Sequence, residues 1–143
     1  MSNTVYPMPG PVAREGTFAG PVAFSNAVRA GRGDLLFVSG QLAFDDDMNI
    51  VGAGDMRAQT RQVLLNIGKA LTAGGATFDD VVRVQVFVTD LSDFRAIHEV
   101  RLEFFDRCRL PASTLVQVSG LAHEDAMIEI DAVAVVGPEE TAA

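Results

Sequence analysis

Short runs of alternating apolar and polar residues, separated by glycine, proline and acidic residues, make up most of the sequence. The runs at 24–31 and 34–44 have the length and composition of strands. A short link that bears two glycines, at 31–34, joins them and is typical of a hairpin. We therefore expect these two strands to pair with each other.

Between residues 55 and 73 the pattern changes, and apolar residues recur at steps of three and four, as in an amphipathic helix. Asp55 can cap the start of this helix, and Gly74 and Gly75 can end it. The stripe that faces the core comprises Met56, Thr60, Val63, Leu64, Ile67 and Leu71.

A second helix is predicted at 92–108, with Ser92 as the N-cap and Pro111 beyond its end. We expect Cys108 to lie on its apolar side as an inert, buried thiol. The other residues on that side are Phe94, Ile97, Phe104 and Phe105.

Three more strands are predicted at 78–90, 112–119 and 126–136, which gives the element order β-β-α-β-α-β-β and an α+β domain. Two helices can cover only one face of such a sheet. In the last strand, one side carries Ile128, Ile130, Ala132 and Ala134, and the other carries Met127, Glu129, Asp131, Val133 and Val135. The uncovered face is thus half apolar, from which we infer a symmetric homo-oligomer with polar residues at or near the subunit contact.

The length of 143 residues fits one domain, and 48% apolar residues suffice for a core. Residues 7–21 are dense in proline and glycine. Within them there is room for one short strand. We expect one domain over 1–143, with an irregular lead-in at 1–21, a core at about 22–136 and a loose tail at 137–143.

The formal net charge is −8, and the basic residues are scattered along the chain, so nucleic acid and anionic membranes are unfavourable partners. A single cysteine excludes an intrachain disulfide and fits a reducing compartment. The N-terminus lacks the order of a secretory signal, and no apolar run is long enough to cross a membrane. We expect a soluble, cytoplasmic protein.

Metal-binding spacing is absent around the two histidines, His98 and His123. The acidic stretch that begins at Asp45 starts like a calcium loop. It then has Ile50 where the loop needs glycine and Met56 where it needs a bidentate glutamate, so we expect a solvated loop and no metal.

Three side chains are candidates for chemistry, each with a structural alternative. Glu129, flanked by two isoleucines, can hold a water or have a raised pKa if its face is closed, or it can be a rim carboxylate. His98 lies beside the apolar stripe of the second helix, where a half-buried structural histidine is the alternative. Arg101 falls within that stripe, and can either snorkel or pair with an acid or an anionic ligand.

Polar residues also line one side of the strand at 112–119, where Ser113 and Gln117 alternate with apolar residues. The loop at 120–125 leads to the strand that carries Glu129, and antiparallel pairing would place Gln117 near Glu129. Cross-strand hydrogen bonding is the simple alternative to a ligand site.

The blocks FSNAV, LLFVSGQ, RAQTRQVLLNIGKAL, GATFDDVVRVQVFVTDL, FRAIHEVRLEFF and IEIDAVAV, in unbroken order over about 22–136, resemble those of the RidA family, also called YjgF or L-PSP. The resemblance implies a chorismate-mutase-like fold in which two helices back a six-stranded, mostly antiparallel sheet. It also implies a homotrimer whose sheets form a central barrel, with ligand clefts between subunits. Its best-known members hydrolyse reactive enamines and imines without a metal or organic cofactor.

The resemblance also assigns roles to single residues. Glu129 would position the attacking water, and Ser39 and Gly40 of the SGQ block would line the cleft. The other substrate-binding candidates are Phe24, where the family has tyrosine, His98, where it has asparagine, Ser113, Thr114 and Gln117.

Ser113 departs most from the family pattern, because the family's substrate-gripping arginine falls at this position. A hydroxyl cannot replace a bidentate guanidinium–carboxylate pair, so efficient deamination of the usual amino-acid-derived imines is not expected. Either Arg101 or Arg14 supplies the missing cation, or the ligand is neutral and meets only hydrogen-bonding groups. The activity is then that of a hydrolase for a small imine, enamine or amide-like metabolite, or the protein is a non-catalytic binding trimer. RNA cleavage ranks a distant third.

Overall fold

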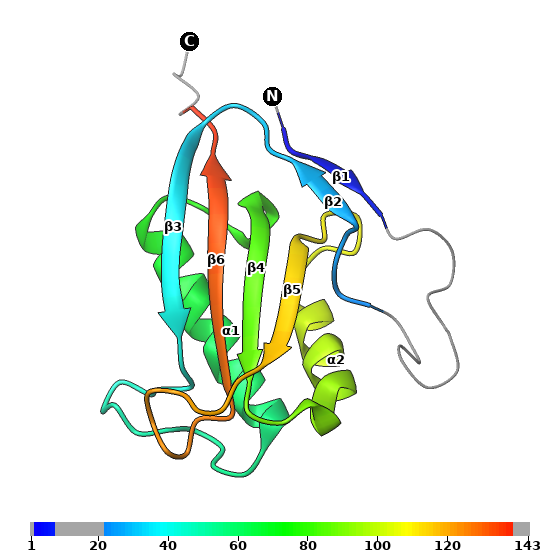
Figure 1. Cartoon of the computed structure of the whole chain (residues 1–143). Helices are drawn as coiled ribbons and strands as arrows, with labels where there is room; N and C mark the ends of the chain where they lie inside the picture. Colours follow the sequence, from blue (N-terminus) through cyan, green and yellow to red (C-terminus); the bar gives the residue numbers. More distant parts are fainter. Residues whose placement is uncertain (1, 8–21, 139–143) are drawn as a thin grey trace.

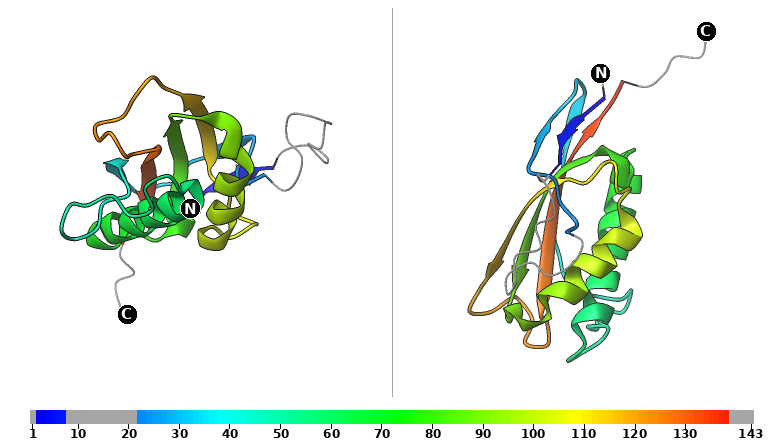
Figure 2. Two further views of the ribbon diagram at one scale, coloured as in Figure 1. Left: turned by 90° about the horizontal axis from the view of Figure 1, so that it is seen from below. Right: turned by 90° about the vertical axis from the view of Figure 1, so that its right-hand side faces the viewer.

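The computed structural model describes residues 2–7 and 22–138. Figure 1 shows a sheet of four strands with two helices behind it and a small two-stranded ladder at one end. This is the α+β architecture predicted from the alternation of strands and helices. Figure 2 shows that both helices lie on the same side of the sheet, so its other face is uncovered.

The four-stranded sheet has the order β3-β6-β4-β5, in which the last described strand lies in the interior. Strand β6 (Ile128–Val136) is antiparallel to both β3 (Asp34–Gln41) and β4 (Val81–Val88). Strand β5 (Ala112–Gln117) is parallel to β4, because helix α2 carries the chain back between them.

The remaining two strands form a separate ladder, in which β1 (Thr4–Tyr6) pairs with β2 (Ala27–Arg29). The predicted hairpin between the strands at 24–31 and 34–44 is therefore wrong, and residues 4–6 of the expected irregular lead-in form a strand. A Cβ on Gly33 would collide with the backbone of Val136. The link at 31–34 thus brings the chain directly into register with β6, and not back onto β2. The described residues thus contain the six strands that the family resemblance implies, divided between a four-stranded sheet and a two-stranded ladder.

Helix α1 (Met56–Ala73) begins and ends where the sequence predicts. The Asp55 carboxylate accepts a hydrogen bond from the Ala58 N–H at 3.0 Å, which satisfies one donor of the first turn. At the other end, the Gly74 N–H donates to the carbonyls of Ala70 and Leu71.

Helix α2 (Phe94–Phe104) is shorter than predicted at both ends. A 3₁₀ turn, η2 (Leu91–Asp93), precedes it, and the Asp90 carboxylate accepts from the Ser92 N–H and hydroxyl, so Ser92 is not the N-cap. Beyond the helix, Phe105 is extended and buried, which turns the chain away. Cys108 therefore lies in an exposed turn, and its prediction as a buried helix residue is wrong.

The core fills the space between the sheet and the helices. The predicted inner side of β6 is completely buried, as are alternate valines of β4. Their partners are Val63, Leu64, Ile67 and Leu71 of α1 with Ile97 and Val100 of α2.

The opposite face of the sheet is open and partly apolar, as predicted. Leu35 and Phe37 of β3 are 59% and 70% exposed, and Val116 of β5 is 41% exposed. Large apolar side chains so exposed on one face are typical of a surface that contacts another molecule.

Candidate functional site

Glu129 lies on the open face of β6, opposite Phe87 of β4 and beside Gly40. The register of β3 against β6 is irregular between Val38 and Gln41, and Gly40 falls within this irregularity. A Cβ on Gly40 would lie 2.8 Å from the Glu129 carboxyl carbon and 2.9 Å from its Oε2. Glycine at position 40 therefore leaves the space that the carboxylate occupies. Ser39, the preceding residue, is exposed.

A second group of candidates lies under helix α2. His98 is buried, and its Nδ1 accepts a hydrogen bond from the Ala23 N–H at 3.0 Å. Burial, followed by the charges of Arg101 and Arg95, lowers the pKa of His98 to about 4. The imidazole is therefore neutral at pH 7, with its proton on Nε2 because Nδ1 is the acceptor.

Arg101 is only 1% exposed and donates from Nη2 to the Ala23 carbonyl at 2.9 Å. The interpretation that it snorkels is therefore wrong. Burial lowers the pKa of Arg101 to about 10, so the guanidinium remains charged at pH 7. Its Nε and Nη1 and the His98 Nε2 have no hydrogen-bond partner within the part of the chain that the structure describes.

Phe24 and Ser25 join this second group to the start of β5. The Phe24 ring lies 5.9 Å from the His98 ring, centroid to centroid. Ser25 donates from its N–H to the Pro111 carbonyl at 2.9 Å and from its hydroxyl to the Leu110 carbonyl at 2.6 Å.

The register of β5 places Ser113 on the helix-covered face. Ser113 lies opposite Val84, and Ser25 forms a parallel bridge with Ala112, its neighbour. Thr114 lies opposite Gln85, on the open face, and is exposed. Phe24, His98 and Ser113 therefore belong to one region at the edge of the sheet.

The predicted proximity of Gln117 to Glu129 is wrong. Strand β4 separates β5 from β6, and Gln117, opposite Val88, shares the helix-covered face. Its side-chain oxygen accepts from the Leu91 N–H at 3.1 Å. The short loop after β5 suggested an antiparallel pair, but it crosses the end of β4 instead.

The candidates thus form two groups on opposite faces of the sheet. Gly40, Thr114 and Glu129 lie on the open face, with Ser39 exposed next to Gly40 in the chain. Phe24, His98, Ser113 and Gln117 lie on the helix side or at its edge. Sequence reasoning missed Ala23 and Ser25, whose backbone and hydroxyl organise the second group. The position of Arg101 within an apolar stripe was the signal that pointed there.

The acidic loop uses its carboxylate for its own turn, since Asp45 accepts from the N–H groups of Asp47 and Asn49, each at 2.9 Å. Within residues 2–7 and 22–138, no three His, Cys, Asp or Glu side chains are grouped closely enough to hold a metal ion. No described helix is long and apolar enough to cross a membrane.

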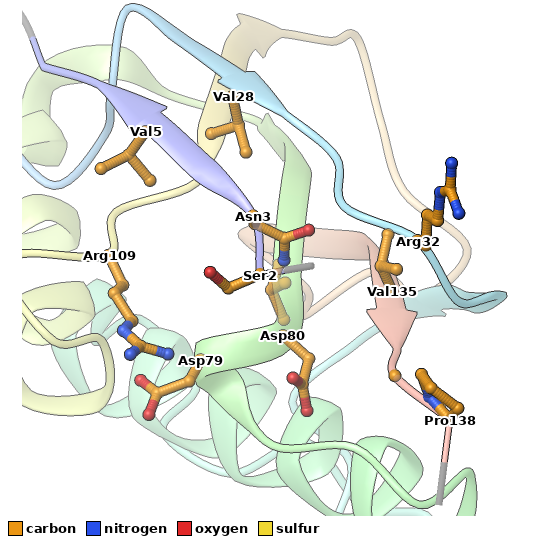
Figure 3. A pocket seen from close by; sticks show the side chains of 12 residues that line it. Ser2, Asn3, Val5, Val28, Arg32, Asp79, Asp80, Arg109, Val135 and Pro138 are labelled. Carbon is orange, nitrogen blue, oxygen red and sulfur yellow. The ribbon is translucent and has the colours of Figure 1, made fainter.

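A cavity of about 210 Å³ lies at the other end of the fold, between β1, β2, η1 (Phe78–Asp80) and the end of β6. Figure 3 shows Arg109 and Asp79 at one side of this cavity and Arg32 at the other. None of the predicted site residues lines it.

The fold and the two groups define a class: a two-layer α+β domain that presents a carboxylate on an open sheet face and a buried polar cluster beneath its second helix. The family model described as Endoribonuclease L-PSP matches residues 17–136. A RutC family protein of Pyrococcus horikoshii is 40% identical over 111 residues, which cover 78% of this chain and 85% of the relative.

Solved structures agree with this match. The Rid family protein YyfB of Yersinia pestis has a TM-score of 0.81 at 32% identity, over 95% of this chain and 100% of the other. TdcF of E. coli, solved with bound serine, has a TM-score of 0.66 at 34% identity, over 82% of this chain and 93% of the other. The chain belongs to the RidA (YjgF/L-PSP) family and has its fold.

Proposed function

We propose that this protein is a RidA-like hydrolase of a small reactive imine, enamine or amide-like metabolite. Membership of the family supports imine deaminase or hydrolase activity at the family level. The observation that carries the proposal for this chain is the space left by Gly40, into which the Glu129 carboxylate extends. That carboxylate lies on the open face, where a water can reach it.

In the proposed reaction, Glu129 orients a water toward the carbon of the C=N bond and accepts its proton as the C–O bond forms. The proton passes to the substrate nitrogen. The C–N bond of the tetrahedral intermediate then breaks as the proton of its new hydroxyl group passes to the nitrogen, which releases ammonia or an amine and leaves a carbonyl product. This hydrolysis consumes one water and needs no oxidant or reductant.

We further propose that a second copy of the chain completes the site. Glu129 and Ser113 lie on opposite faces of one sheet, so one subunit alone cannot present both to a small molecule. The exposed apolar side chains around Phe37 support association through the open face. A homotrimer with clefts between subunits meets both requirements.

Ser113 itself cannot hold a substrate carboxylate in the way that an arginine at this position would. The E. coli relative was solved with serine, a molecule that carries a carboxylate. At the position of the family's arginine this chain offers only a hydroxyl, which cannot form the paired, charge-assisted hydrogen bonds of a guanidinium.

The test is release of ammonia and carbonyl product from a panel of small imines and enamines generated in situ. Wild type should exceed the rate in buffer for at least one substrate, and Glu129→Gln should lose that activity. Glu124→Gln, which changes an exposed loop carboxylate, is the matched control and should retain it. Wild-type rates equal to buffer across the panel would refute the hydrolase.

The alternative is a non-catalytic trimer that binds a metabolite, and the loss of the arginine at position 113 favours it. It predicts saturable binding without conversion. Ser113→Arg separates the two functions: activity gained only in this variant would show that the native site does not serve amino-acid imines. RNA cleavage, the activity in the printed name of the family model, remains third because the net charge of −8 opposes binding of a polyanion.

A further inference from the structure

Arg101 is the largest side chain that is fully buried among the described residues. One of its nitrogens, Nη2, donates to the Ala23 carbonyl, while Nε and Nη1 have no partner in the described chain. No carboxylate there forms an ion pair with Arg101. By contrast, three arginines on the outer surfaces of the helices each pair with a glutamate: Arg57, Arg61 and Arg95.

An unpaired, buried guanidinium is costly. Each buried donor without an acceptor costs about 1–3 kcal/mol, and an uncompensated charge costs more. A buried arginine in a protein is therefore almost always paired with an acidic side chain or an anionic ligand. Arg101 combines both costs, so a missing anionic partner is the simplest physical account of its environment.

His98 adds a third unpaired donor on the same helix, one turn before Arg101. Its Nδ1 accepts from the Ala23 N–H, so the proton lies on Nε2, which has no partner among the described residues. Residues three apart on a helix share a face, and both side chains contact Ala23. The cluster offers only donors and a positive charge, and these match the two acceptor oxygens of a carboxylate.

We propose that Arg101 and His98 form a buried anion subsite that takes the carboxylate of the substrate, in place of the arginine that is absent at position 113. This inference rests on the proposed function for its link to catalysis, and it narrows the substrate to imines and enamines that bear a carboxylate. Arg14, the other candidate cation, lies outside the described residues.

The segment at 22–26 covers this subsite and connects it with Ser113. Ser25 bridges Ala112, so the segment lies between helix α2 and the start of β5. It belongs to neither ladder of the fold apart from that bridge. A carboxylate in this subsite accepts from Nε and Nη1 of Arg101 and from Nε2 of His98, the donors that have no partner among the described residues. In this proposal, the segment at 22–26 moves to admit the carboxylate.

Binding of pyruvate, measured by calorimetry, tests the subsite without any need for turnover. Pyruvamide, the neutral analogue, is the ligand control. Arg101→Met removes the charge and keeps most of the volume, and Arg95→Met, at an exposed arginine of the same helix, is the matched control. Wild type and Arg95→Met should bind pyruvate equally. Arg101→Met should bind it at least about thirtyfold more weakly, which corresponds to about 2 kcal/mol.

A second measurement needs no variant. In wild type, the NMR signal of the Arg101 Nε–H should shift on addition of pyruvate and remain unchanged on addition of pyruvamide. Absence of pyruvate binding, equal binding by Arg101→Met and wild type, or an unchanged Arg101 signal would each overturn the subsite.

These outcomes are independent of the test of hydrolysis. Turnover of neutral imines without pyruvate binding would support the proposed hydrolase and refute the anion subsite. Pyruvate binding that depends on Arg101, without turnover of any substrate, would support the anion subsite and refute the proposed hydrolase activity.

Discussion

Gly40 and Glu129 show how the absence of a side chain can determine the position of a functional group. The Cβ of an alanine at position 40 would lie 2.8 Å from the carboxyl carbon of Glu129, well inside van der Waals contact. The clash falls on the end of a flexible side chain, which can rotate away. The carboxylate would therefore move to a new position, while the backbone of the sheet would keep its place.

We predict that Gly40→Ala changes the free energy of unfolding by less than about 1 kcal/mol. A displacement of about 1 Å should nevertheless lower kcat by about 10²-fold. Gly120→Ala is the matched control, because a Cβ at position 120 meets no atom within 4 Å. Thermal melts and turnover of the three proteins measure both effects. Full activity in Gly40→Ala would show that the position of this carboxylate is not critical.

His98 predicts a pH dependence of stability. Burial is the main cause that lowers its pKa from 6.5 to about 4 in the folded protein. Between these values an unfolded chain takes up a proton that the folded chain does not bind, so the free energy of unfolding falls as the pH falls from about 6.5 to 4. The slope from this group is at most about 1.4 kcal/mol per pH unit.

His98→Asn isolates this contribution, since an amide oxygen can still accept from the Ala23 N–H but does not titrate. Urea unfolding at several pH values gives the free energy of unfolding of wild type and of His98→Asn. As the pH falls from 6.5 to 4, the value for wild type should fall relative to the value for the variant. Parallel curves for wild type and His98→Asn would contradict the buried, neutral imidazole.

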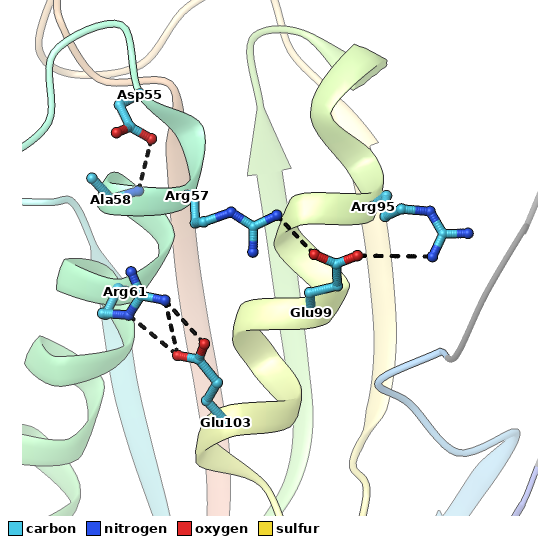
Figure 4. Close-up of polar contacts among 7 residues, drawn as sticks. All are labelled: Asp55, Arg57, Ala58, Arg61, Arg95, Glu99 and Glu103. Carbon is cyan, nitrogen blue, oxygen red and sulfur yellow. Dashed lines mark hydrogen bonds and ion pairs between the residues drawn. The ribbon is translucent and has the colours of Figure 1, made fainter.

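At the scale of elements, the two helices meet along a row of ion pairs, shown in Figure 4. Arg57 and Glu99 lie 2.7 Å apart, and Arg61 and Glu103 lie 3.0 Å apart. All four side chains are roughly half exposed, so water and salt screen their attraction.

Arg61→Met should therefore lower the free energy of unfolding by less than about 1 kcal/mol, and 1 M salt should remove the difference. Leu64→Ala, on the buried side of the same helix, should cost about 2–5 kcal/mol at any salt concentration. Urea unfolding at one fixed protein concentration measures both. A larger effect for Arg61→Met would mean that the ion pairs hold the helices together.

Features that depend on neighbouring residues in the sequence could be predicted, whereas features that depend on contacts between residues far apart in the sequence could not. Asp55, Gly74 and the inner side of β6 follow from spacing and capping chemistry, and the sequence predicts them correctly. The partner of a strand is not encoded in its own alternation, so β2 was paired with the wrong strand and β5 with the wrong neighbour. Motif blocks predicted Glu129 and Gly40 as site residues. The structure places the two side by side, and their role in the reaction stays a prediction. The environment of Arg101 depends on a contact with Ala23, 78 residues away, which no local pattern contains.

At the scale of the whole molecule, the open face of the sheet makes the oligomeric state testable. Phe37 projects from β3 with 70% of its surface exposed, opposite Val133. Phe37→Lys places a charge in the proposed contact and should convert the proposed trimer, of about three times 15.2 kDa, into monomers.

Light scattering after size-exclusion chromatography measures the mass. Leu65→Lys, at an exposed leucine of α1 on the helical side, should leave the trimer intact. A monomeric wild type, or a trimeric Phe37→Lys, would exclude the open face as the contact and with it a site shared between subunits.

The interior position of β6 has a consequence for synthesis of the protein. Strands β3 and β4 do not pair with each other. β3 pairs only with β6, and the edge of β4 that is not covered by β5 also pairs with β6, which is made after both. While a ribosome is still translating the chain, both helices can form, but the two waiting strands have unpaired edges and exposed valines. Such edges readily join other chains. The nascent protein is thus most vulnerable to aggregation in the interval between the emergence of β4 and that of β6. Loss of those nine residues would leave nothing for β3 to pair with.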